Sequence, residues 1–441
     1  MSARRTGVAI ALATAGLAAS LAVRAAGQTA APYPGVLDEH PAIQYDTRPT
    51  NDPVARLNDA LRSGSRRLTH DDGVGYLRAV LAALEVPAES QVLVFSKSGI
   101  QRAFTSPQNP RALYYNRAVV VGYIPGAPVL EVAAQDPQQG TIFYTLDQDA
   151  TSEPRFVRGT TCLTCHVSAS TLDVPGPIAR SNRVSEDGSL LLRAGPSITV
   201  NHQTPHTQRW GGWFVTTSLS TPPYQQLGHL GNLTISDYQG DDAPAIVSNR
   251  ALVRWLDSDP ESRGYLSSVS DLAALLVFDH QMHAMNLLTR LNWEARVIAA
   301  AGPLNVQAPE MRARVDELAD YLLFVGEAPL ALTVTPRPGL AEKVMARTPK
   351  DHKGRSLGQF DLEQRLMRYP CSYMIYSPAF DGLPPALREA VYRRMFEILN
   401  RQDADPRYAH LSTADRVAIA EIVGDTKADL PADLRQVSRA R

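Results

Sequence analysis

The chain has 441 residues, more than one ordinary domain requires, and 44% of them are hydrophobic and 20% charged. These values are typical of a soluble globular protein with a substantial core. The formal net charge of −1 argues against a nucleic-acid partner, because such partners are bound by strongly basic surfaces.

Residues 1–27 have the pattern of a signal peptide for export. Arg4 and Arg5 precede an apolar run over residues 8–23, which is followed by the small residues Ala25, Ala26 and Gly27. The run is short for a membrane span and no later segment reaches the necessary length, so we expect no stable membrane insertion. The alternative is an N-terminal anchor that stays uncleaved. We expect a periplasmic or secreted protein.

Residues 28–150 read as a β-rich N-terminal region. A proline-rich arm extends to about residue 53, and the apolar spacing over residues 71–84 predicts a helix. From residue 91 to 147, short β-branched and aromatic runs alternate with Pro, Gly and Asn signals; the runs are QVLVFS, ALYYN, AVVVGYI, VLEVAAQ and TIFYTLD. This alternation predicts a small antiparallel sheet.

Residues 151–441 are expected to be loop-rich at first and then helical. Gly and Pro occur throughout residues 148–248. A capping box at Ser268 to Asp271 predicts the start of a long helix that ends at Ala301, before Gly302. Further helices are expected over residues 309–325, 384–400 and 412–423. The sequence therefore predicts an α+β protein with a β-rich N-terminal part and an α-helical C-terminal part.

The loop-rich segment contains one motif with specific chemistry. Cys162, Cys165 and His166 form the sequence Cys-Leu-Thr-Cys-His, which is the attachment signature of c-type haem. Two cysteines three residues apart on one turn can add to the two vinyl groups on one edge of a porphyrin. The adjacent histidine then stands over the ring and can bind the iron. The cofactor expected from these residues is one covalent haem c.

Three other interpretations compete for the cysteine pair. A structural zinc site usually needs four ligands, and the only further cysteine is Cys371. A thioredoxin-like redox pair has the same spacing, but no Trp precedes Cys162. A plain disulfide in an oxidising compartment is the third alternative. Haem attachment is favoured, because an export signal independently directs the chain to the compartment where haem is attached.

In Cys162 to His166 the chain resembles the bacterial periplasmic c-type cytochromes. The resemblance implies thioether bonds at Cys162 and Cys165, His166 as the proximal iron ligand, and a C-terminal part that resembles a cytochrome c-like haem domain. The chain is much longer than a simple cytochrome c. The segments RWGGWF, GHLGN and DHQMHAMN are similar to large single-haem exported proteins that have no named activity.

The sixth iron ligand decides between an electron carrier and an enzyme. His280 is one candidate, because it falls on the apolar face of the long helix with Leu276, Ala284 and Leu287. His283 is expected on the opposite, solvent-facing side, beside Asp279 and Asn286. His229 is an equal candidate, because neighbouring glycines would let its loop approach the ring closely. Other candidates are an open site or the side chains of Met282, Met285, His202 and His206.

Two further groups of residues bear on the expected haem site. Several arginines of the haem segment are candidates to pair with the haem propionates, namely Arg180, Arg183, Arg193 and Arg209. The odd cysteine, Cys371, is expected to be a buried inert thiol.

The expected function is electron transfer by an exported single-haem cytochrome. Its partner would be a redox protein or a small-molecule electron donor or acceptor. The alternative is a haem c enzyme, a peroxidase or a substrate oxidase, with an open or labile sixth iron site. A third class, a haem-based sensor, lacks a signalling domain in the sequence, and no catalytic residue is identified from the sequence.

Overall fold

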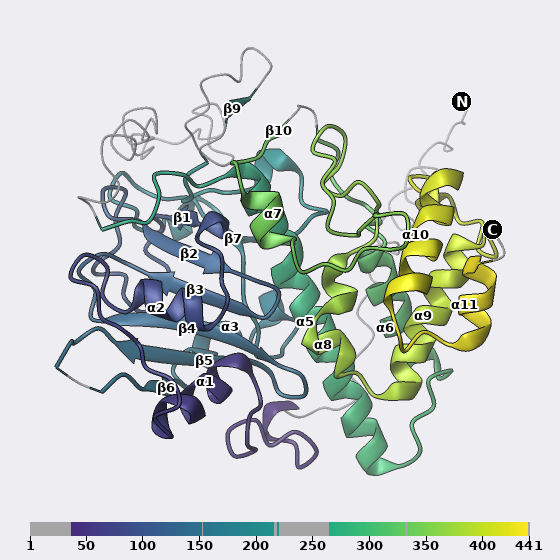
Figure 1. Cartoon of the computed structure of the whole chain (residues 1–441), viewed down its shortest axis with the longest axis horizontal. Helices are drawn as coiled ribbons and strands as arrows, with labels where there is room; N and C mark the ends of the chain where they lie inside the picture. Colours follow the sequence, from purple (N-terminus) through teal and green to yellow (C-terminus); the bar gives the residue numbers. More distant parts are fainter. Residues whose placement is uncertain (1–36, 152, 216–217, 220–263, 331–333, 440–441) are drawn as a thin grey trace, which may run out of the picture. The chain divides into compact units, whose positions relative to one another are not determined.

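The computed structural model describes residues 37–151, 153–215, 218–219, 264–330 and 334–439. They form an α+β fold, with an antiparallel sheet of six strands in the N-terminal half and helices in the C-terminal half (Figure 1). The predicted fold class is confirmed at this level. None of the helices in these ranges is long and apolar enough to cross a membrane.

Each strand of the sheet pairs with the next one along the chain. The strands are β1 (Val92–Val94), β2 (Arg111–Tyr115), β3 (Val119–Tyr123), β4 (Val129–Asp136), β5 (Gly140–Asp147) and β6 (Phe156–Arg158). The turn between β4 and β5 ends at Gly140, whose φ of +79° is a conformation that glycine adopts without strain. The first five strands match the five predicted runs, and three of them extend one residue beyond the run. The sequence pattern does not reveal β6, because three residues are too few to show alternation.

Alternate strand residues point to opposite faces of the sheet. One face carries Tyr114, Val121 and Ile142, which share a hydrophobic core with α1 (Pro53–Arg62) and α2 (Leu77–Ala83). Asp52 caps α1 and also accepts a hydrogen bond from the Tyr144 hydroxyl at 2.7 Å. The opposite face, with Leu113 and Val120, belongs to the core around α5 (Leu272–Ala301).

The central helix α5 starts later than predicted. Asp271, rather than Ser268, is its N-cap, because the Asp271 carboxylate accepts a hydrogen bond from the backbone of Ala274 at 3.1 Å. The same carboxylate accepts the Arg337 backbone N–H at 2.9 Å, which holds it in place. The helix ends before Gly302, as predicted. Most of its residues are buried around the whole circumference, so α5 is an interior helix between the sheet and the C-terminal helices.

After α5 the chain continues as further helices, of which α6 (Pro309–Leu322) contacts α5 directly and α9 (Pro385–Leu399) contacts α6. Three of them confirm predicted segments: α6, α9 and α10 (Thr413–Thr426). Ser412 caps α10 in a capping box with Asp415, whose backbone N–H donates to the serine hydroxyl at 3.0 Å. Shorter helices follow no predicted segment: α7 (Leu340–Val344), α8 (Pro378–Asp381) and α11 (Ala432–Arg439).

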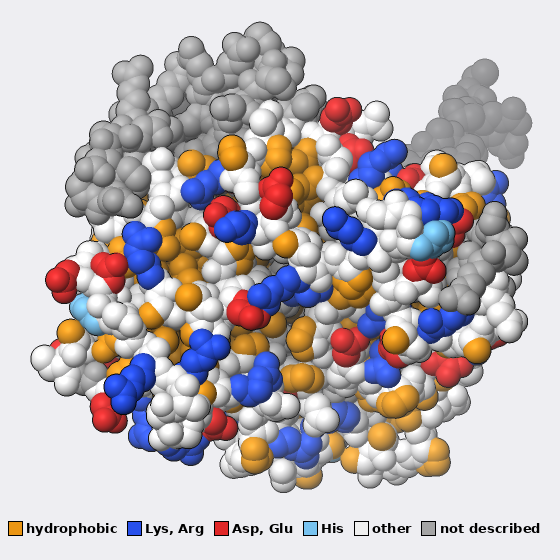
Figure 2. All heavy atoms as spheres, viewed as in Figure 1, with side chains coloured by type: hydrophobic (Ala, Val, Ile, Leu, Met, Phe, Trp, Pro, Cys, Tyr) orange, Lys and Arg blue, Asp and Glu red, His pale blue; other side chains and the backbone are white. Residues whose placement is uncertain are grey.

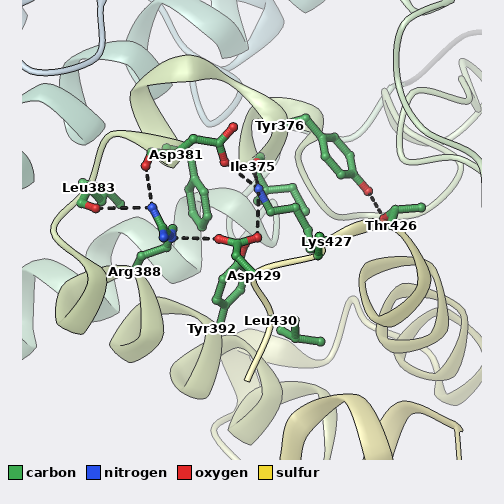
Figure 3. Close-up of polar contacts among 12 residues, drawn as sticks. Ile375, Tyr376, Asp381, Leu383, Arg388, Tyr392, Thr426, Lys427, Asp429 and Leu430 are labelled. Atoms are coloured by element: carbon green, nitrogen blue, oxygen red, sulfur yellow. Dashed lines mark hydrogen bonds and ion pairs between the residues drawn. The ribbon is translucent and has the colours of Figure 1, made fainter. Parts of the chain in front are cut away.

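A buried lysine joins the last helices to the rest of the core (Figure 3). Lys427, which follows α10, donates to the Asp381 carboxylate at 2.6 Å and to the Ile375 carbonyl at 3.0 Å. Asp429 lies 3.5 Å from the same ammonium group and 2.7 Å from Arg388. On the surface, by contrast, basic and acidic side chains are interspersed over the face shown in Figure 2 rather than gathered in one patch.

Candidate functional site

The cysteine–histidine motif forms one helical turn directly after the sheet. It is the short helix α3 (Leu163–His166), in which the backbone N–H of Cys165 and that of His166 both donate to the Cys162 carbonyl, at 3.2 and 3.0 Å. Cys162 and Cys165 are free thiols. Cys162, Cys165 and His166 all line the same cavity. The predicted motif residues therefore lie together.

The cavity has a volume of about 360 Å³ and lies between the sheet, α3 and α5. Its sheet wall consists of residues from the face that looks away from α1 and α2, including Leu113, Gly122, Glu131, Ala133, Phe143 and Thr145. Gly122 pairs with Leu113 on one side and Glu131 on the other, and its lack of a side chain leaves room between them. The cavity thus draws on both predicted parts of the chain, the β-rich region and the region of the motif.

The His166 imidazole has one nitrogen fixed by the backbone. Its Nδ1 lies 2.8 Å from the carbonyl oxygen of Gly176. A carbonyl oxygen can only accept, so Nδ1 carries the proton and Nε2 keeps a free lone pair. Burial lowers the pKa of His166, which favours the neutral ring. A neutral imidazole whose other nitrogen donates to a backbone carbonyl is the usual state of a histidine that binds a metal.

The histidine loop is packed tightly on α5. Asn286 on α5 donates its Nδ2–H to the Pro177 carbonyl at 3.0 Å. A Cβ at Gly176 would come within 1.9 Å of Asn286 Oδ1, so only glycine allows this close approach. On its other side, the His166 ring lies 4.6 Å from the Phe143 ring, measured between centroids. The imidazole is therefore held between the sheet and α5.

Two side chains of α5 line the cavity, Phe278 and Met282. They are four residues apart and therefore lie on one side of the helix. Met282 is 1% exposed. Met285 is buried in the hydrophobic core and does not line the cavity. Among the sixth-ligand candidates that the structure describes, Met282 alone lines the cavity that holds His166.

His280 lies elsewhere in α5. Its Nδ1 is 2.7 Å from Nδ1 of His202, and its Nε2 is 2.6 Å from the Ser372 hydroxyl. Its ring stacks on Phe324 at 4.4 Å between centroids. His280, His202 and His206 do not line the cavity. The apolar surroundings that the sequence indicated for His280 are the rings of Tyr321 and Phe324. The second candidate, His229, lies outside the described residues.

His283 does not lie on a fully solvated face as predicted, because its side chain is half-buried. Its ring packs 4.9 Å from Tyr321, and burial lowers its pKa to about 4. Asp279 and Asn286, expected on the same solvated face, are each only 2% exposed. The Asp279 carboxylate accepts a hydrogen bond from the Trp210 indole N–H at 2.9 Å and forms an ion pair with Arg209, so it has polar partners inside the protein. The polar side of α5 is therefore a buried network.

The arginines around the cavity differ from the expected set. Of the four predicted, Arg180 lines the cavity, whereas Arg183, Arg193 and Arg209 do not. Arg209 is 1% exposed and lies 3.5 Å from Asp279. Two arginines from before the motif also line the cavity, Arg102 and Arg111. Their proximity depends on the pairing of the sheet, and the sequence gives no local signal for it.

Glu131 is the acidic side chain of the cavity wall, and its charge is compensated. Its carboxylate accepts hydrogen bonds from Arg111 and from Gln101, both at 3.0 Å. With Arg102 and Arg180 added, the polar part of the lining carries an excess of positive charge. The site is thus suited to a largely apolar group that carries carboxylates.

Two observations concern the alternatives considered for the cysteines. Within the described ranges, no three His, Cys, Asp or Glu side chains come together as a metal-holding group. Cys371 is fully buried, and burial raises the pKa of its thiol, which agrees with the expected inert thiol.

No family model matches the chain, and comparisons with curated proteins and with solved structures found no match.

Proposed function

We propose that the chain is an exported c-type cytochrome that binds one covalent haem and transfers electrons. Cys162 and Cys165 would form the two thioether bonds, and His166 would bind the iron through Nε2. The observation that carries this proposal is the state of His166. It lines the same cavity as both cysteines, and its Nδ1 is bonded to the Gly176 carbonyl at 2.8 Å, which leaves Nε2 free.

The residues present fit a haem. Cavities that hold cofactors have volumes of roughly 300–1,000 Å³ and mostly apolar walls with a few polar groups. This cavity, of about 360 Å³, has such walls, and Arg102 and Arg180, which are not paired with Glu131, would pair with the propionates. Attachment adds each thiol S–H across one vinyl group, so that sulfur binds one vinyl carbon and hydrogen the other. The bound haem would supply an iron that cycles between its ferrous and ferric states.

The chain's own residues would orient the cofactor and exclude water. Gly176 and Asn286 hold the histidine loop against α5, and Phe143 packs against the imidazole ring. Such contacts fix the tautomer and direction of a metal-binding histidine. Phe278 and Trp213 cover the cavity with apolar surface, which reduces solvent access to the haem.

The lining supports electron transfer over a haem enzyme. Peroxidase or oxidase chemistry needs a positioned acid or base beside an open iron site. His166 is the only histidine among the described residues of the lining, and the Glu131 carboxylate is bonded to Arg111. The redox partner would be a protein or a small molecule. The signal-peptide pattern of residues 1–27 supports a periplasmic or secreted location.

Haem staining on a denaturing gel tests the proposal, because only covalent haem survives denaturation. The protein is produced with export and a cytochrome c maturation system. The wild type and a Cys371→Ala control are expected to stain, whereas a Cys162→Ala, Cys165→Ala variant is expected not to stain. A wild-type protein that shows no stain and has both thiols free would overturn the proposal.

A further inference from the structure

The side of α5 that faces the cavity carries a regular series of residues. Phe278 and Met282 line the cavity, and Asn286 follows at the same spacing of four. Residues four apart lie one above the other on a helix. Asn286 is bonded to Pro177, which adjoins Gly176, the hydrogen-bond partner of His166. The helix that carries Met282 therefore also fixes the loop of the proximal histidine, one turn further on.

Outside the motif, one side chain of the described lining is suited to bind iron and has no other polar partner. It is the thioether of Met282. The Glu131 carboxylate is bonded to Arg111 and Gln101. The Tyr144 hydroxyl donates to Asp52 on the far side of the sheet. A thioether is a soft ligand that makes only weak hydrogen bonds, so burial leaves its sulfur available at little cost.

His280, the other candidate ligand on α5, already has hydrogen-bond partners. Both ring nitrogens of His280 have hydrogen-bond partners, at 2.7 and 2.6 Å, and the ring stacks on Phe324. To reach the cavity, His280 would have to break both bonds and deprive His202 and Ser372 of these buried partners. A buried polar group that loses its hydrogen-bond partner destabilises the folded protein, so this rearrangement is unfavourable.

We propose that Met282 is the sixth ligand of the haem iron. The inference rests on the proposed function, since it needs haem at Cys162, Cys165 and His166. It makes the iron six-coordinate and low-spin, bound by an imidazole nitrogen and a thioether sulfur. Methionine with histidine raises the reduction potential relative to two histidines. The site would then be a relatively oxidising electron carrier.

The test is the visible spectrum of the haem-loaded protein and of three variants. Met282→Leu removes the sulfur and keeps the apolar volume, an exchange that folded proteins usually tolerate. Met285→Leu is the matched control, since Met285 is buried on the same helix but does not line the cavity. Met282→His offers the iron a nitrogen ligand instead.

We expect the ferric wild type to be low-spin and to show the weak far-red charge-transfer band of a sulfur-ligated haem. Met282→Leu should lose the band, become high-spin and bind carbon monoxide in the ferrous state. Met285→Leu should keep the wild-type spectrum. Met282→His should be low-spin without the band and have a lower reduction potential.

The inference is overturned if the wild type is high-spin, or if Met282→Leu keeps the wild-type spectrum. These failures are distinguishable from failure of the proposed function. In both cases the denaturing gel would still show covalent haem in the wild type and in Met282→Leu, whereas failure of the proposed function leaves all four proteins without haem.

Discussion

The Asn286 side chain donates a hydrogen bond to the Pro177 carbonyl at 3.0 Å, and this contact joins the loop of His166 to the central helix. The contact needs glycine at position 176, because a Cβ there would meet Asn286 Oδ1 at 1.9 Å. The position of the proposed iron ligand thus depends on the fit between a glycine and an asparagine that are 110 residues apart by their numbers, 286 and 176.

A double-mutant cycle tests this fit. Gly176→Ala should lower the free energy of unfolding by about 1–3 kcal/mol, because the new methyl group overlaps the amide. In an Asn286→Ala background the same substitution should cost clearly less, since the overlapping atom is gone. The two costs are measured by denaturant unfolding. Additive costs would show that Gly176 and Asn286 do not interact as described.

His280→Ala should change stability but not the haem. The substitution removes two buried hydrogen bonds and a ring stacked on Phe324, so we expect a loss of roughly 2–4 kcal/mol. The visible spectrum should stay that of the wild type, because the His280 side chain does not line the cavity. A low-spin spectrum that turns high-spin in this variant would instead identify His280 as an iron ligand.

Lys427→Met should weaken the attachment of the last helices. The lysine side chain is 6% exposed and forms ion pairs with Asp381 and Asp429 (Figure 3). The substitution removes the positive charge beside both carboxylates. Because both carboxylates are partly exposed, we expect a loss of about 1–3 kcal/mol, less than for a fully buried pair. Lys343→Met is the control, since Lys343 is 62% exposed and 3.9 Å from Glu89. Equal effects of the two substitutions in thermal unfolding would contradict the description of Lys427.

Glu327 predicts a specific pH dependence. Burial raises its pKa from an ordinary 4.5 to about 7, so the folded state favours the protonated form. Its contribution to stability is fully present below about pH 4.5 and is lost as the pH rises towards 7. Glu327→Gln does not titrate and still offers an oxygen to the Leu366 backbone N–H. Relative to the wild type, it should gain roughly 1–3 kcal/mol between acidic and neutral pH.

The check is denaturant unfolding at several pH values, with Glu363→Gln as a control at an exposed position. The control should show the same pH dependence as the wild type. A Glu327→Gln curve that runs parallel to that of the wild type would refute the raised pKa.

Local patterns in the sequence predict five of the six strands, the main helices and the turn of the motif. Five strands match runs of β-branched and aromatic residues, and the capping box at Ser412 marks α10 correctly. These features depend on neighbouring residues. The start of α5 differs, because the oxygen of Asp271 rather than that of Ser268 caps the first turn.

The sequence pattern did not predict which side of α5 faces the cavity, because this orientation depends on the tertiary structure. A helix that is buried on every side has no solvated face. The apolar neighbours of His280 in the sequence therefore did not show whether it faces the cavity or another part of the interior. The polar positions Asp279 and Asn286 were misleading for the same reason, since their partners come from distant loops. Arg111 likewise reaches the cavity only through strand pairing.

The central claim is that haem is bound covalently, and the intact mass of the denatured, exported protein tests it most directly. We expect a polypeptide that starts between about residues 25 and 31, heavier by one haem. Digestion should place the added mass on the peptide with Cys162 and Cys165. An exported protein whose mass equals that of the polypeptide alone, with both thiols open to alkylation, would contradict the account.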